Sequence, residues 1–202
     1  MPTPKGNGRP TDPKISEKLL DTAERILETD GFQGLRVEAL VSEAQTSRPA
    51  MYRRFPDLAH LTLEVLLRRY GDNRVEPTGT LAGDLLQLQL NEAKMLSEPL
   101  MAKTLPALLK AVSDDPKLGK LLYEEFILPR RLRVKEVIDN AVDRGELGTG
   151  SYNLVFICNL LLGPLMSLSM VPSASADLSA DAARMTAEVV ERELRVATGS
   201  PE

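Results

Sequence analysis

Basic and aromatic side chains gather between residues 48 and 54, where Arg48, Tyr52, Arg53 and Arg54 stand close together. A guanidinium group can donate two hydrogen bonds to one guanine, and a tyrosine hydroxyl suits a phosphate oxygen. Residues 45–74 hold six arginines against three acidic residues, although the chain of 202 residues has a formal net charge of −4. The positive charge is therefore local. Such a run is also typical of a solvated helix face, so its structural setting must decide between the two interpretations.

A short helix can expose this chemistry at its first turn. Ser47 is a suitable N-cap, and Pro49 fits a first turn because the amides there have no intrahelical acceptor to lose. Met51 and Phe55 lie four residues apart and are predicted to face a core, which leaves Arg48 on the outside. This is the face that a recognition helix offers to the major groove of DNA.

Two further helices must support that short one. The first is predicted to begin after Asp12-Pro13 and to end at Asp30-Gly31, and the second lies near residues 37–44. A turn at Gln45-Thr46 then completes a helix-turn-helix motif over about residues 37–56. Helical periodicity continues to the end of the chain without convincing strand alternation, so the predicted fold class is all-α.

The longer C-terminal part is predicted to be a separate helical domain. A loop covers residues 71–80, a helix begins at Thr80, and PSASAD at residues 172–177 forms another loop. Pro129 should kink the helix that holds it. The predicted helices after the one at Thr80 span residues 99–112, 115–144, 151–170 and 179–196.

Residue types and spacings argue against an enzyme. His60, the single histidine, lies far along the chain from Cys158, the single cysteine, and no phosphate loop or zinc spacing accompanies either. Cys158 has apolar neighbours and is predicted to be a buried hydrophobe. The apolar run Leu154–Met170 is shorter than the ~20 residues that a bilayer requires. We therefore expect a cytoplasmic protein with no metal, no cofactor and no membrane contact, preceded by a flexible polar arm at residues 1–13.

Residues 14–70 resemble the N-terminal domain of the TetR/AcrR family of bacterial transcriptional regulators. The resemblance runs through ISEKLLDTAERILETDGF and then through Val37, Ala44, Ser47, Met51, Tyr52, Phe55 and Leu61. It implies a three-helix DNA-binding domain followed, over residues 71–202, by a larger domain that binds a small effector and forms a homodimer. The implied partner is a double-stranded, near-palindromic operator, and the usual activity in such families is repression that the effector relieves.

The resemblance also implies particular DNA contacts. Tyr52 would grip a phosphate, residues 48–50 and Arg53 would face base edges, and the start of the fourth helix near His60 would touch the backbone. Arg36 replaces the usual cap of the second helix and would meet a phosphate through its charge. The full predicted set is Arg36, Thr46, Ser47, Arg48, Pro49, Ala50, Tyr52, Arg53, Arg54 and His60.

Three positions depart from the family pattern. Gln45 replaces the usual glycine of the turn, Arg36 cannot cap as Ser or Thr does, and Leu58 replaces a lysine that contacts phosphate. These departures support an alternative, an all-α ligand-binding or anti-repressor protein that keeps the fold without binding an operator.

Flexible and polar side chains in the C-terminal part are candidates for an effector pocket, although residues of these types more often simply fill the core. The basic run Arg130, Arg131, Arg133 and Lys135 could bind an acidic group, but the favoured interpretation is the outer face of a kinked helix. The resemblance implies that the dimer forms through the last two helices, at about residues 151–170 and 179–196. An apolar helix at residues 154–170 agrees with dimerisation, because it has more hydrophobic surface than one small domain covers. The candidate pocket residues are Met95, Met101, Tyr123, Phe126, Asn159 and Met166.

Overall fold

Helices account for every regular element in the described part of the chain. The computed structural model describes residues 12–72, 74–171 and 178–199, and residues 1–11 of the predicted arm and the predicted loop at 172–177 lie outside these ranges. The all-α prediction is confirmed. The elements are α1 (Pro13–Asp30), η1 (Phe32–Gly34), α2 (Val37–Glu43), α3 (Arg48–Tyr52), α4 (Leu58–Tyr70), α5 (Leu81–Ser97), α6 (Pro99–Asp114), α7 (Pro116–Leu122), η2 (Tyr123–Ile127), α8 (Leu128–Asp143), α9 (Leu154–Met170) and α10 (Leu178–Thr198).

Capping residues set the predicted helix starts. The Asp12 carboxylate accepts a hydrogen bond of 3.0 Å from the Lys14 N–H at the start of α1. The Thr80 hydroxyl accepts one of 3.1 Å from the Gly83 N–H at the start of α5. Each bond satisfies an amide that has no partner within its own helix.

The predicted helix over residues 115–144 is divided by a wider turn. The π-helical segment η2 joins α7 to α8, and the Leu128 N–H donates to the Tyr123 carbonyl, five residues back. Pro129 follows immediately, and because it has no N–H it leaves the carbonyl four residues earlier without an α-helical donor. The chain therefore responds to this proline with a π turn, which adds a residue to the helix and changes the direction of the side chains beyond it.

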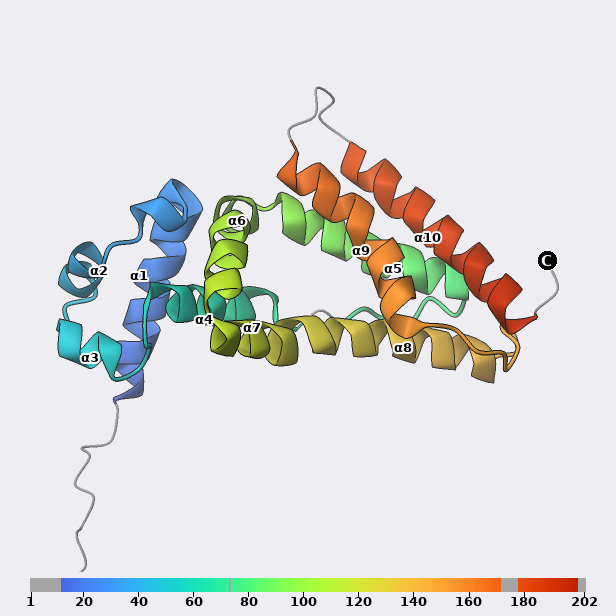
Figure 1. Ribbon diagram of the computed structural model, residues 1–202, viewed down its shortest axis with the longest axis horizontal. Helices are drawn as coiled ribbons and strands as arrows, with labels where there is room; N and C mark the ends of the chain where they lie inside the picture. Colours follow the sequence, from blue (N-terminus) through green and yellow to red (C-terminus); the bar gives the residue numbers. More distant parts are fainter. Residues whose placement is uncertain (1–11, 73, 172–177, 200–202) are drawn as a thin grey trace, which may run out of the picture.

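Figure 1 shows an elongated molecule with α1–α4 at one end and α5, α8, α9 and α10 at the other. Helix α6 stands between them and packs on both α1 and α4. One buried apolar cluster fills the α1–α4 domain and continues into α6 and α7, and a second lies among α5, α8, α9 and α10. The core of the N-terminal domain is therefore continuous with the part of the C-terminal domain that it touches.

Polar contacts fix α6 against the N-terminal domain. The Lys103 ammonium donates hydrogen bonds of 2.8 Å to the carbonyls of Glu28 and Thr29, at the C-terminal end of α1. A cation is favourable there because the last carbonyls of a helix carry partial negative charge. Gly31 ends α1 with φ 68° and ψ −170°, and a Cβ at this position would lie 3.1 Å from the Lys103 carbonyl oxygen.

We expect Gly31→Ala to destabilise the fold by about 1–3 kcal/mol, because this backbone conformation is nearly restricted to glycine and Lys103 leaves no room. Urea unfolding of the two proteins measures the difference. Gly79→Ala is the matched control, since Gly79 also has a positive φ, 89°, but has no atom within 4 Å of an added Cβ. Equal losses in the two variants would show that the contact with Lys103 is unimportant.

Candidate DNA-binding surface and ligand cavity

The turn between α2 and α3 takes the geometry of a helix C-cap in which Gln45 occupies the usual glycine position. Gln45 has φ 52°. Its N–H donates 3.2 Å to the Ser42 carbonyl, and the Thr46 N–H donates 2.8 Å to the Val41 carbonyl. This pair of bonds defines the Schellman motif. The substitution of Gln for Gly therefore leaves the turn formed, with a left-handed residue that carries a side chain.

The short helix α3 begins at the predicted N-cap, Ser47, and its first turn includes exposed residues. The Ser47 hydroxyl caps it by accepting 3.3 Å from the Ala50 N–H. Met51 and Phe55 are buried, whereas Tyr52 is 50% exposed. Ala50 is only 6% exposed, so the prediction that its side chain faces base edges is wrong. The reason is that so short a helix packs through two consecutive residues, Ala50 and Met51.

The exposed cations around α3 differ in what they contact. Arg48 pairs with Glu38 of α2 at 2.5 Å, and both side chains are exposed. An exposed pair of this kind contributes ~0–1 kcal/mol, so a phosphate or base can replace Glu38 at low cost. Arg36 and Arg53 are exposed and form no ion pair with any residue in the described ranges.

Arg54 is engaged inside the domain. Its guanidinium donates to the Ser16 hydroxyl at 3.0 Å, to the Ala50 carbonyl at 2.7 Å and to the Asp12 carbonyl at 3.1 Å. It thus ties α3 to the start of α1. These contacts make Arg54 a residue that positions α3, rather than a free side chain like Arg53.

His60 is also turned inward, and its predicted contact with the DNA backbone at the start of α4 stays a prediction. Its side chain is 17% exposed, and Nδ1 lies 3.0 Å from the Asp57 carboxylate. The possible ligand atoms of Asp57, His60 and Asp115 lie within 4.8 Å of one another, which places the imidazole near the N-cap of α7. Burial opposes ionisation of Asp57, but hydrogen bonds from the His60 N–H and ring outweigh it and lower the pKa of this carboxyl.

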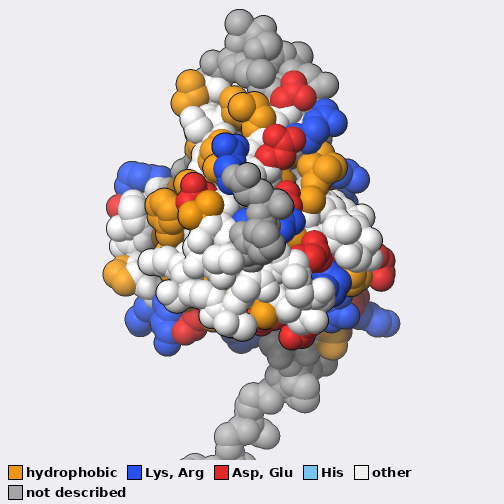
Figure 2. All heavy atoms as spheres, turned by 90° about the vertical axis from the view of Figure 1, so that its right-hand side faces the viewer, with side chains coloured by type: hydrophobic (Ala, Val, Ile, Leu, Met, Phe, Trp, Pro, Cys, Tyr) orange, Lys and Arg blue, Asp and Glu red, His pale blue; other side chains and the backbone are white. Residues whose placement is uncertain are grey.

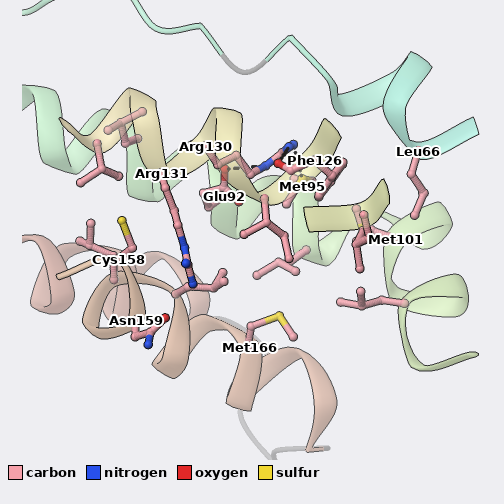
Figure 3. Close-up of a pocket in the computed structure, with 18 of the residues that line it drawn as sticks. Leu66, Glu92, Met95, Met101, Phe126, Arg130, Arg131, Cys158, Asn159 and Met166 are labelled. Carbon is pink, nitrogen blue, oxygen red and sulfur yellow. Dashed lines mark hydrogen bonds and ion pairs between the residues drawn. The ribbon is translucent and has the colours of Figure 1, made fainter. Parts of the chain in front are cut away.

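A cavity of about 210 Å³ lies between the C-terminal helices, and Figure 3 shows its lining. It is lined by five of the six predicted pocket residues, namely Met95, Met101, Phe126, Asn159 and Met166. Tyr123 is not among the lining residues and is 42% exposed, so its prediction is wrong. It lies in the π turn, where the helical phase differs from that of a regular helix. Leu66 of α4 also lines the cavity, so the cavity reaches the N-terminal domain.

The basic run of α8 is divided between the cavity and the surface. Arg130 and Arg131 line the cavity, which corrects the interpretation of the whole run as an outer face. Arg133 and Lys135 pair with Glu136 at 2.5 Å and Asp139 at 2.6 Å on their own helix. A basic run is usually solvated, so the sequence holds no signal that would separate its inward from its outward members.

Arg130 connects the cavity to the end of α4. Its guanidinium donates 2.6 Å to the Tyr70 carbonyl and 2.9 Å to the Phe126 carbonyl, and it lies 3.6 Å from the centroid of the Phe126 ring. Glu92 of α5 pairs with it at 3.3 Å. Burial lowers the pKa of Arg130, and the neighbouring Glu92 opposes that effect. Sequence reasoning singled out Arg130 as part of the basic run but did not identify its partner Glu92.

An exposed basic turn on a helix-turn-helix, joined to a helical domain with a cavity, defines a helix-turn-helix transcriptional regulator. Two family models match the chain. "Bacterial regulatory proteins, tetR family" covers residues 19–65, and "Tetracyclin repressor-like, C-terminal domain" covers residues 75–191. The second match alone spans more than half of the chain.

Known proteins agree with the family models. An HTH-type transcriptional regulator of Mycobacterium tuberculosis is 32% identical over 170 residues, which are 82% of this chain and 83% of the relative. YdeS of Bacillus subtilis, also an HTH-type transcriptional regulator, is 25% identical over 78% of this chain and 79% of its own length. The chain belongs to the TetR family and is a DNA-binding transcriptional regulator rather than an enzyme.

Solved structures show the same fold. A TetR transcriptional regulator from Agrobacterium tumefaciens aligns with TM-score 0.67 and 20% identity, covering 90% of this chain and 94% of that one. A TetR-family regulator from Mesorhizobium loti aligns with TM-score 0.66 and 18% identity, covering 92% and 98%. In the described ranges, no helix combines the length and apolar character needed to cross a bilayer.

We expect Gln45→Gly to stabilise the protein by about 0.5–1 kcal/mol. Glycine removes the ~1–2 kcal/mol strain of a left-handed residue, and its greater freedom in the unfolded chain returns part of the gain. Thermal unfolding measures the change. Gln33→Gly is the control, because Gln33 is exposed in η1 and has no positive φ, so the same substitution should destabilise there. A loss of stability in Gln45→Gly would contradict the strain argument.

Proposed function

We propose that the protein is a homodimeric repressor that binds a near-palindromic operator through α3 and releases it when a small effector fills the cavity. The observation that carries the proposal is that the cavity is lined in part by Leu66, a residue of α4 in the DNA-reading domain. A ligand there can contact the DNA-binding unit directly.

The exposed turn of α3 supports sequence-specific DNA binding. Arg48 and Tyr52 lie four residues apart on the exposed side of the helix, and Arg53 follows. Thr46 and Ser47 directly precede α3, and Arg36 is an exposed residue at the start of α2. In the proposed complex Arg48 and Arg53 read base edges, with Pro49 against them, while Tyr52 and Arg36 hold phosphates.

Exposed apolar side chains on α9 and α10 support the homodimer. Figure 2 views the molecule from the end at which α8 and α10 terminate. In the upper half of this view, hydrophobic side chains are exposed at the surface among charged ones. Apolar surface of this extent is costly in water and suits burial against a second copy. The exposed apolar residues of the two helices include Val155, Phe156, Leu162, Met185, Val189 and Val196.

The effector can act only through different affinities for the DNA-competent and DNA-incompetent arrangements of the dimer. Two reading helices must lie one helical turn of DNA apart, ~34–36 Å, to occupy both half-sites. A ligand that moves α4 changes that spacing, because α4 joins the reading domain to the cavity. The alternative of a protein that has lost operator binding rested partly on Gln45, and the intact turn at Gln45 favours the regulator instead.

The main test is fluorescence anisotropy with DNA from upstream of the protein's own and neighbouring reading frames, titrated against salt and a random duplex. We expect selective binding that weakens steeply with salt, because phosphate contacts release counterions. Equal affinity for both DNAs would favour the alternative function.

Two substitutions should separate base reading from phosphate binding. Arg48→Ala should cost about 1–3 kcal/mol on the operator and much less on a random duplex, because a base contact is lost. Tyr52→Phe should cost about 0.5–1.5 kcal/mol on both, because only a phosphate hydrogen bond is removed. Anisotropy on the two duplexes measures each variant. An equal loss on both duplexes for Arg48→Ala would overturn its assignment to base reading.

The double substitution Met185→Glu, Val189→Glu should convert the dimer to a monomer, because it places charge in the proposed apolar interface. Sedimentation velocity measures the mass. Leu132→Glu is the control, since Leu132 of α8 is 51% exposed and lies outside α9 and α10. A double variant that sediments as the wild type does would exclude this face as the interface.

A further inference from the structure

We propose that the cavity selects ligands with an apolar body and a single carboxylate, and that Arg131 is the residue that binds the carboxylate. The inference rests on the proposed function, in which this cavity holds the effector, and adds the chemical class of that effector. The supporting observation is that Arg131 lines a largely apolar cavity in which the other two charged residues, Glu92 and Arg130, pair with each other.

The cavity lining is apolar apart from five side chains, and most of these are already engaged. Gln89 donates hydrogen bonds of 2.8 Å to the Leu161 carbonyl and 2.6 Å to the Thr186 hydroxyl. Glu92 and Arg130 pair with each other at 3.3 Å, so their charges cancel. The apolar remainder favours a ligand that is largely hydrocarbon. Arg131 and Asn159 are left to recognise a polar group.

Arg131 extends from α8 across the cavity towards the α9 side, where Cys158 and Asn159 lie (Figure 3). Its Cζ lies 5.6 Å from the centroid of the Tyr123 ring, and it forms no hydrogen bond or ion pair with any residue of the described ranges. The neighbouring Arg133 and Lys135, in contrast, both have carboxylate partners on the surface. A guanidinium that is partly withdrawn from water gains most from an anionic partner.

A carboxylate fits this position better than other charged groups. The planar fork of an arginine donates two parallel hydrogen bonds to the two oxygens of a carboxylate, and the Asn159 amide offers a further donor. Burial raises the pKa of the Cys158 thiol, and the charge of Arg131 opposes this only in part, so the thiol does not replace the ligand as a counterion. One guanidinium balances one negative charge, whereas a dianionic phosphate would leave one negative charge unbalanced in an apolar space.

Isothermal titration of the full-length protein with octanoate, 1-octanol and octylamine tests the inference, because the three probes share one chain and differ in the head group. We expect octanoate to bind about tenfold or more tightly than 1-octanol, and octylamine most weakly. Arg131→Gln should remove the preference for octanoate, and Arg131→Lys should keep part of it because it keeps the charge. Arg133→Gln is the matched control and should bind octanoate as the wild type does.

Three results would overturn the inference: equal binding of octanoate and 1-octanol, unchanged octanoate affinity in Arg131→Gln, or no binding of any probe at millimolar concentration. Circular dichroism and operator affinity without ligand confirm that Arg131→Gln is folded. The operator assay also separates this inference from the proposed function. If octanoate binds through Arg131 but does not release the operator, only the proposed effector role of the cavity is contradicted. If 1-octanol releases the operator and octanoate does not, only the proposed preference for a carboxylate is contradicted.

Discussion

The buried guanidinium of Arg130 joins the parts of the molecule that the proposed function requires to act together. It binds the Tyr70 carbonyl at the end of α4, the Phe126 carbonyl in η2 and the Glu92 carboxylate of α5. Arginine stays charged in proteins, and leaving a buried charge without its partners is costly, so these elements are held in one arrangement. The α1–α4 core continues into α6 and α7, which makes the reading domain part of the cavity wall rather than an independent unit.

In the proposed function, this arrangement would let a small ligand influence DNA binding. The cavity is lined by Leu66 of α4, by Arg130 and by Arg131, so a molecule within it touches both the reading domain and the residue that anchors it. A ligand alters the equilibrium only if it fits one arrangement of these elements better than the other. Under the proposed function, the close packing of α6 on α1 through Lys103 and Gly31 would carry a shift of α4 to the N-terminal domain.

Local chemistry made much of the fold predictable. Ser47 and Thr80 begin helices because their hydroxyls satisfy free amides, and Met51 and Phe55 face the core because of their spacing. The inward arginines were not predictable, since the π turn before Pro129 adds a residue and shifts the helical phase by roughly 100°. Ala50 was misplaced because the short helix α3 is oriented by its packing rather than by its own periodicity.

The link through Arg130 can be measured most directly by hydrogen exchange of the wild type and Arg130→Gln, without DNA or ligand. Loss of the guanidinium should accelerate exchange at the C-terminal end of α4 and in α2–α3, as well as in α8, because the reading domain loses its anchor. Acceleration confined to α8 and η2 would contradict the account, since the cavity and the DNA-reading domain would then be independent of each other.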